Sequence, residues 1–288
     1  MQRGDAHEGW LAAAGRSLFR HGPVQALGLL VAVGLKEHYR TASVEQLRWM
    51  LAPLAWLVGG VTGIPFAWEA QTGYVSTSAG ISLVPACAGI NFLVVCFVAL
   101  FLTLVHRLRS GRARLAWLLL AGGASWAITL WANTVRIASS IYLARADLQG
   151  AWVTPERVHR LDGIVIYLGF LLAAYLAAER LTRPRLRLRR PLASAARVLS
   201  VPFACYLLVT VLIPFLNAGG LRREPLFVEH VVVVLAVSAF LFAACFCCAV
   251  LYQGAVDTPG SESEHRRVRL RRPAEPPAIS RQEAETRC

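Results

Sequence analysis

Three residues in this chain have side chains whose types suit the transfer of a peptide acyl group: Cys87, Arg136 and His159. A thiolate attacks a carbonyl carbon, and an imidazole takes the thiol proton and later protonates the leaving amine. A fixed guanidinium stabilises the oxyanion or anchors the substrate. Because Cys87 opens a long apolar run in the turn-like context 85–91 (PACAGIN), we expect this nucleophile at a membrane boundary.

The composition places these three residues in a membrane protein. Of the 288 residues, 56% are hydrophobic and 16% are charged, and this apolar content exceeds what one soluble core would hide. A helix that crosses a bilayer needs about 20 apolar residues, because its backbone polar groups must be satisfied within the segment. Runs of this kind lie at 49–66, 84–105, 115–143, 163–178, 197–217 and 231–252.

The sequence therefore predicts an all-α fold, a bundle of about six to seven transmembrane helices. The seventh candidate, Pro23–Leu35, has only 13 residues, so we expect a helix there and leave its crossing open. The expected parts are an N-terminal segment at 1–39, a membrane core at 40–180 that carries the three residues, a basic cytoplasmic loop with two further spans at 181–254, and a disordered basic tail at 255–288.

The positive charge of the chain lies in the loops between these helices. The net charge is +13, and arginines are concentrated at 106–114 and 180–197, whereas 67–83 contains neither Lys nor Arg and 145–162 contains three. The positive-inside rule places the two arginine-rich loops in the cytoplasm and the other two outside. This distribution is typical of a protein in the cytoplasmic membrane, and no nucleic-acid partner is expected.

Counting along the predicted helices puts the three residues at one face of the membrane. Arg136 lies about 20 residues from the cytoplasmic end of its helix, at the outer boundary of the hydrocarbon. Cys87 is expected about one turn into a helix that starts outside, and His159 is expected just before the next span. An arginine inside a membrane helix costs roughly 2.5 to 3.5 kcal/mol at the centre and by default marks a functional site.

Other kinds of protease have no signature in the sequence. There is no His-Glu-x-x-His metal helix and no Gly-x-Ser-x-Gly serine motif, and the spans hold too few acidic residues for an aspartyl dyad. The cysteines at 245, 247 and 248 have no His or carboxylate nearby and make a poor metal site. We expect neither a metal nor a cofactor.

The order of these motifs resembles the exosortase/archaeosortase family of multi-pass transpeptidases. Cys-x-Gly-Ile opens one span, Asn-x-x-Arg-Ile lies late in the next, and His-x-x-x-Gly enters the third. The stretch Ala42–Phe97 looks most like the K-type exosortases. The resemblance covers roughly residues 40–178, and residues 197–288 have no counterpart in the family core.

The resemblance implies a membrane-embedded cysteine peptidase that cleaves C-terminal sorting signals of exported proteins and transfers the acyl group to an acceptor. Such a signal has a short motif outside, a transmembrane helix and a basic cytoplasmic end, so the expected partners are that protein substrate and the membrane lipids. By the same resemblance, Cys87 is the nucleophile, Arg136 the catalytic or substrate-positioning arginine, and His159 the general acid and base. The expected site lies on the outer face of the cytoplasmic membrane.

Four further residues are expected to support this site. Gly89 lets a substrate backbone approach closely. Asn91 either orients the thiol or the scissile carbonyl, or bonds to a neighbouring helix. Asn133 and Gly163 complete the motifs around Arg136 and His159.

A second class of function stays open at this point. The chain is alternatively a transporter or a lipid-binding membrane protein in which Arg136 binds an anionic substrate and Cys87 is incidental. A transporter of this kind has broken helices near the bilayer midplane and inverted repeats. Gly122-Gly123, in the middle of a span, is the only support for it in the sequence, and glycine at a helix contact explains this pair equally well.

Overall fold

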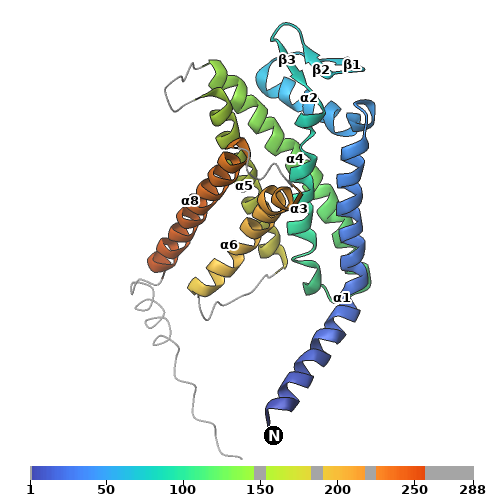
Figure 1. The fold of residues 1–288 in the computed structure, drawn as a ribbon, viewed down its shortest axis with the longest axis vertical. Coiled ribbons are helices and arrows are strands. Elements are labelled where there is room, and N and C mark those ends of the chain that lie inside the picture. The colour runs from blue at the N-terminus through green and yellow to red at the C-terminus, as the bar shows by residue number, and fades with distance from the viewer. Residues whose placement is uncertain (1, 146–153, 183–190, 218–224, 257–288) are drawn as a thin grey trace, which may run out of the picture. The chain divides into compact units, whose positions relative to one another are not determined.

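The computed structural model describes residues 2–145, 154–182, 191–217 and 225–256 (Figure 1). Its helices are α1 (Gln2–Thr41), α2 (Arg48–Thr62), α3 (Ile90–Phe101), α4 (Gly111–Arg145), α5 (Pro155–Thr182), α6 (Pro191–Leu207), α7 (Ile213–Asn217) and α8 (Pro225–Val256). Short helical turns join some of them: η1 (Glu45–Leu47), η2 (Pro85–Ala88), η3 (Val105–Arg107) and the π-helical η4 (Leu208–Leu212). The chain divides into two compact units, 1–246 and 247–288, and the predicted site belongs to the first.

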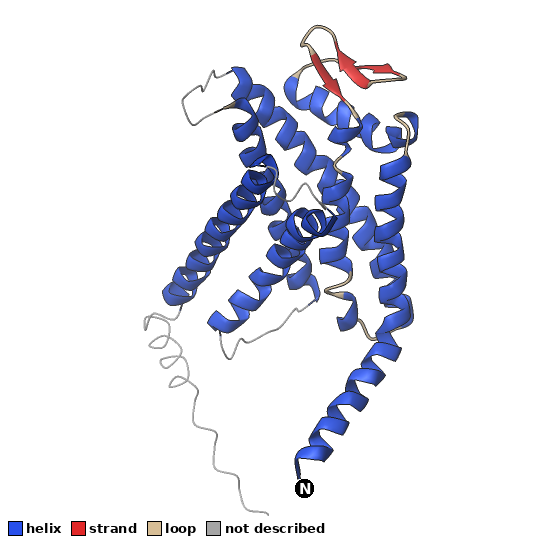
Figure 2. Ribbon diagram, in the orientation of Figure 1, coloured by secondary structure: helices blue, strands red, loops and turns tan. Residues whose placement is uncertain are grey.

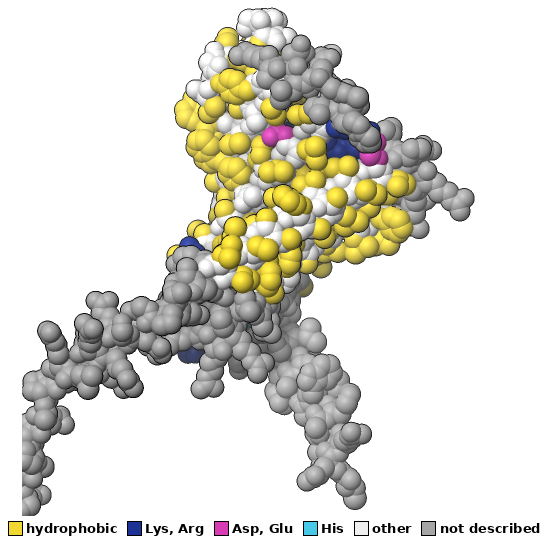
Figure 3. Space-filling model, turned by 90° about the vertical axis from the view of Figure 1, so that its left-hand side faces the viewer, with side chains coloured by type: hydrophobic (Ala, Val, Ile, Leu, Met, Phe, Trp, Pro, Cys, Tyr) yellow, Lys and Arg dark blue, Asp and Glu magenta, His cyan; other side chains and the backbone are white. Residues whose placement is uncertain are grey.

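Five helical segments of the described chain are long and apolar enough to cross a membrane. They are Pro85–Arg107, Gly111–Leu143, Arg157–Thr182, Val198–Leu216 and Phe227–Leu251. Among the described residues drawn in Figure 3, hydrophobic side chains predominate and charged side chains are few. These features support the predicted class, a helical multi-pass membrane protein.

The total of six to seven spans stays a prediction. Two of the segments counted in it form helices whose lengths differ from those expected. The run 49–66 forms α2, which has 15 residues and ends at Thr62. At 1.5 Å per residue such a helix covers about 22 Å, less than the hydrocarbon thickness of about 30 Å. The run Pro23–Leu35 is helical, as predicted, but it lies within the 40-residue helix α1. The predicted tail at 255–288 lies outside the described residues beyond Val256.

A small antiparallel sheet interrupts the otherwise helical fold (Figure 2). Its strands are β1 (Ala67–Glu69), β2 (Gly73–Ser76) and β3 (Ile81–Leu83), in the order β1-β2-β3, with Ala67 opposite Val75 and Val75 opposite Ser82. The all-α prediction missed it, because strands of three or four residues are too short to show a period-2 pattern. The sheet leads the chain directly into η2, which contains Cys87.

The helix α3 is the buried centre of the first unit. Ten of its 12 residues are buried, and α1, α4, α5 and α6 all pack against it. Figure 1 shows α3 between α1 and α6. The approach of α1 requires Gly28, because a Cβ atom there would lie 2.0 Å from the Phe101 ring.

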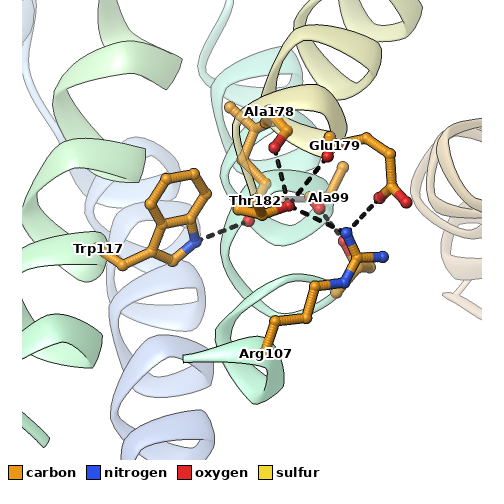
Figure 4. A network of polar contacts seen from close by, with 8 residues as sticks. Ala99, Arg107, Trp117, Ala178, Glu179 and Thr182 are labelled. Atoms are coloured by element: carbon orange, nitrogen blue, oxygen red, sulfur yellow. Dashed lines mark hydrogen bonds and ion pairs between the residues drawn. The ribbon is translucent and has the colours of Figure 1, made fainter. Parts of the chain in front are cut away.

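A buried ion pair joins the end of α3 to the end of α5 (Figure 4). Arg107 in η3 contacts Glu179 and donates a hydrogen bond of 3.0 Å to the Thr182 hydroxyl. The side chains of Arg107 and Glu179 are only 14% and 10% exposed. Because removing one partner of such a pair leaves a charge buried without compensation, this contact fixes the two helices at the end of the bundle away from Cys87.

We expect Glu179→Ala to lower the stability of the folded protein by about 3 kcal/mol, the cost of stranding a buried charge. Glu37→Ala is the matched control, because it breaks the ion pair of Glu37 with Arg40, whose two side chains are 57% and 71% exposed, respectively. Exposed ion pairs contribute at most about 1 kcal/mol to stability. The measurement is the apparent unfolding temperature in detergent. Equal shifts of the unfolding temperature in the two variants would contradict the assignment of Arg107 and Glu179 as a buried, stabilising ion pair.

Candidate active site

Cys87 lies in a turn that precedes α3. The turn η2 begins at Pro85, and α3 begins only at Ile90. Gly89 separates them, because its φ of +69° is left-handed and interrupts the helical backbone. Cys87 thus lies in the first turn of the span Pro85–Arg107, as predicted, but this turn is the short helix η2, and the N-terminus of α3 lies after the cysteine.

The side chain of Asn133 holds this turn in place. Asn133 lies on α4 with none of its surface exposed. Its Nδ2 donates a hydrogen bond of 3.2 Å to the Cys87 carbonyl, and its Oδ1 accepts a hydrogen bond from the Tyr167 hydroxyl. A Cβ atom at Gly89 would lie 2.0 Å from Asn133 Nδ2. In this structure the glycine therefore makes room for Asn133, whereas we expected it to make room for a substrate backbone.

Arg136 and His159 are in direct contact, as the predicted site requires. Nη1 of Arg136 lies 3.3 Å from Nε2 of His159, and Nδ1 of His159 lies 2.9 Å from the Ser140 hydroxyl. A guanidinium has no acceptor atom, so Nε2 accepts and the imidazole proton is on Nδ1, which donates to Ser140. His159 is thus neutral in this arrangement.

The helices that carry this pair extend further than the sequence predicted. His159 lies inside α5, which begins at Pro155, whereas it was expected just before a span. Arg136 lies nine residues before the end of α4 at Arg145. Since both residues are within helices, their side chains come from two packed surfaces rather than from a loop.

Tyr167 connects the pair to the cysteine turn. Its ring lies 5.5 Å from the guanidinium of Arg136 and stacks on Phe92 of α3 at a centroid distance of 4.5 Å, while its hydroxyl bonds to Asn133. Sequence analysis missed Tyr167 and Ser140. Helical spacing was the available signal, because Ser140 follows Arg136 by four residues and shares its face.

Asn91 and Gly163, the two remaining predicted residues, lie at the same end of the bundle and make different contacts. Asn91 accepts a hydrogen bond of 2.5 Å from Lys36 Nζ on α1, so it bonds to a neighbouring helix, the second of the two roles considered for it. Gly163 is buried, and a Cβ atom there would lie 3.5 Å from Arg136 Cδ, so the arginine stem passes directly over it.

A cleft of about 1090 Å³ lies beside Arg136, and Asn91, His159, Gly163 and Tyr167 also line it. Cys87 is half-buried and is not among the described residues that line the cleft. In the part of the chain that the structure describes, its thiol makes no hydrogen bond to Arg136 or His159. The structure thus brings Arg136 and His159 together and ties Cys87 to them through Asn133 and Tyr167.

Within the described ranges, no three His, Cys, Asp or Glu side chains gather in a way that could hold a metal ion. Among known proteins, no family model, no curated protein and no solved structure matches this chain. The resemblance to exosortases therefore rests on the sequence motifs alone.

We expect Gly89→Ala to change the reactivity of Cys87, because the new methyl group displaces the Asn133 amide from the Cys87 carbonyl. Gly80→Ala is the matched control, since Gly80 has φ +64° but nothing within 4 Å of the added Cβ. Both variants carry the strain of a left-handed alanine, roughly 1 to 2 kcal/mol, and only the first disturbs the turn.

The measurement is the rate of N-ethylmaleimide alkylation at Cys87 in a chain whose other cysteines are replaced. A several-fold change in Gly89→Ala alone supports the described geometry. Identical alkylation rates in the two variants would show that Asn133 does not control the turn.

Proposed function

We propose that this chain is a membrane-embedded cysteine peptidase and transpeptidase of the exosortase kind. It cleaves C-terminal sorting signals of exported proteins at the outer face of the cytoplasmic membrane and passes the acyl group to an acceptor. One observation carries the proposal: Arg136 and His159, which lie on different helices, meet at 3.3 Å. The same face of α4 also presents Asn133, which bonds to the turn of Cys87.

The Arg136–His159 contact has a direct consequence for the chemistry. While Arg136 donates to Nε2, the lone pair of the imidazole is occupied and the base is idle. When the guanidinium turns to the carbonyl oxygen of a bound substrate, Nε2 becomes free to take the proton of the Cys87 thiol. Binding of the substrate thereby activates the base and prepares the oxyanion site in one movement.

The reaction then proceeds in two halves. The Cys87 thiolate attacks the scissile carbonyl carbon, and Arg136 stabilises the negative charge on its oxygen. The C–N bond breaks as the protonated His159 gives its proton to the leaving amine, which leaves a thioester on Cys87. The acceptor, an amine or a hydroxyl, gives its proton to His159 as it attacks the thioester, and the thiol is restored.

The surrounding residues position these groups. Ser140 accepts a hydrogen bond from Nδ1, so it keeps the imidazole in the tautomer whose Nε2 faces Arg136. The Tyr167 ring supports the guanidinium from its face. The thiol and Nε2 must come into hydrogen-bond reach when substrate binds, as in enzymes whose catalytic contacts tighten only then.

Variants of the three residues separate this enzyme from a transporter. We expect Cys87→Ala to abolish the processing of a precursor that has a C-terminal motif, an apolar helix and terminal arginines. His159→Ala is expected to slow processing by roughly 100-fold or more, the usual contribution of a general base. Arg136→Lys keeps the charge but loses the planar fork, so an oxyanion role predicts a loss of roughly 100-fold.

Cys96→Ala and Cys205→Ala are the controls for this experiment, because both cysteines lie within helices of the apolar bundle. They are expected to process the precursor normally. The measurement is the ratio of precursor to processed form on a gel, with the amount of inserted enzyme determined in parallel. Normal processing by inserted Cys87→Ala would exclude the peptidase and favour the transporter.

A further inference from the structure

The cleft beside Arg136 changes its chemical character along its length. Its floor is α3, from Asn91 near the start of that helix to Leu102 just after its end, a rise of about 17 Å. The end near Asn91 carries Lys36, Arg136 and Arg160. Toward Leu102 the lining becomes aliphatic.

Two of the cations at the polar end have no counter-ion in the described chain. Lys36 bonds to the neutral Asn91, and Arg136 contacts the neutral His159. Among the described residues, neither has a carboxylate oxygen within the 4.0 Å of an ion pair. The Nε atom of Arg136 is moreover buried without a hydrogen-bond partner. Lys36 is exposed and Arg136 is half-buried, and because a partly buried cation without a counter-ion is costly, these two groups favour an anionic ligand.

Three carboxylates near these cations are already engaged elsewhere. Asp162 accepts a hydrogen bond of 2.6 Å from the Ser139 hydroxyl. Glu37 also lines the cleft, but its carboxylate accepts hydrogen bonds of 2.6 and 3.0 Å from Arg40, which lower its pKa. Glu229 of α8 lies 3.1 Å from Arg157 and 3.6 Å from Arg160. It compensates the third cation of the cleft and leaves Lys36 and Arg136 to the ligand.

The apolar part of the cleft opens at an exposed, apolar surface of the bundle. Its rim on α1 is formed by Leu29 and Val33, which are 54% and 57% exposed. The opposite rim, on η4 and α7, is formed by Leu208 and Ile213, which are 42% and 41% exposed. Because α1 and α6 both pack on α3, the cleft lies between the two rims with α3 beneath. A ligand from the bilayer therefore has a lateral entrance.

We propose that this cleft binds an anionic phospholipid of the surrounding bilayer, with its phosphate at Lys36 and Arg136 and an acyl chain along α3. A phospholipid carries the anion and the apolar chain in one molecule, in the order in which the cleft presents its cations and its aliphatic walls. Guanidinium and ammonium groups both bind phosphate oxygens strongly. A transmembrane helix of another protein would supply an anion to Lys36 and Arg136 only if it had an acidic residue at the same depth in the membrane.

This site gives the C-terminal helices a role. Tyr206 of α6, Val209 and Thr210 of η4, and Val234 of α8 line the same cleft, although residues 197–288 have no counterpart in the exosortase core. The π-helical turn η4 lies at the rim, and such turns are frequent at functional sites. The C-terminal helices thus form the wall that turns a groove on α3 into a lipid-binding cleft.

The test uses the full-length protein in detergent with fluorescent phosphatidylglycerol and phosphatidylcholine of identical chains as probes. We expect the dissociation constant of the unmodified protein for phosphatidylglycerol to be about tenfold lower than that for phosphatidylcholine. The double variant Lys36→Gln/Arg136→Gln is expected to bind both lipids equally. Arg48→Gln is the control, because this cation stacks on Trp68 outside the cleft.

Two further experiments distinguish a bound phospholipid from a free phosphate compound and from a polypeptide in the cleft. Glycerol phosphate, which has the headgroup but no chain, is expected to compete only weakly, and Val33→Trp, which fills the rim, is expected to weaken both lipids. A photo-crosslinking residue at position 33 in membranes is expected to capture lipid. Equal affinity for the two lipids, strong competition by glycerol phosphate, or capture of a polypeptide instead of lipid would overturn the proposal.

Both proposals use Arg136, but they can be tested separately through Cys87, which does not line the cleft in the described structure. Cys87→Ala is expected to keep the preference for phosphatidylglycerol. Loss of precursor processing with lipid preference retained supports both proposals. Normal processing by Cys87→Ala excludes the peptidase alone, and an absent lipid preference excludes the lipid site alone.

Discussion

The buried amide of Asn133 is the contact on which the candidate site depends. It has no exposed surface, so both of its polar atoms need protein partners. Nδ2 finds one in the Cys87 carbonyl and Oδ1 finds one in the Tyr167 hydroxyl. One side chain on α4 thereby fixes the turn before α3 and a residue of α5. Loss of this amide would leave two buried groups unsatisfied at the point where three segments meet.

The chemistry of the site follows from what lies one helical turn further along α4. Arg136 reaches His159 and holds it neutral, with Ser140 on the other ring nitrogen. The arginine has no carboxylate partner among the described residues, and we propose that its ligands are a substrate oxyanion and a lipid phosphate.

Much of this arrangement could be predicted from residue types, and the remainder depended on tertiary contacts. Apolar runs predicted most of the long helices. The positions of Arg136 and His159 near helix ends predicted a shared site, and the contact between their side chains agrees with it. The sheet escaped notice because its strands have only three or four residues. The break between η2 and α3 was not predicted, because apolar composition does not reveal a left-handed glycine at Gly89. Tyr167 was not predicted, because its role depends on the hydrogen bond of its hydroxyl to Asn133, a tertiary contact between α5 and α4.

Mass spectrometry of the peptide that contains Cys87 tests the central claim most directly. The enzyme would be purified from cells that are processing the precursor, with His159→Ala analysed alongside. The proposed mechanism predicts a hydroxylamine-labile thioester on Cys87 whose mass equals that of the precursor up to the cleaved bond, and its absence in His159→Ala. A free Cys87 thiol in enzyme that is turning over, or an adduct of that mass on another cysteine, would contradict it.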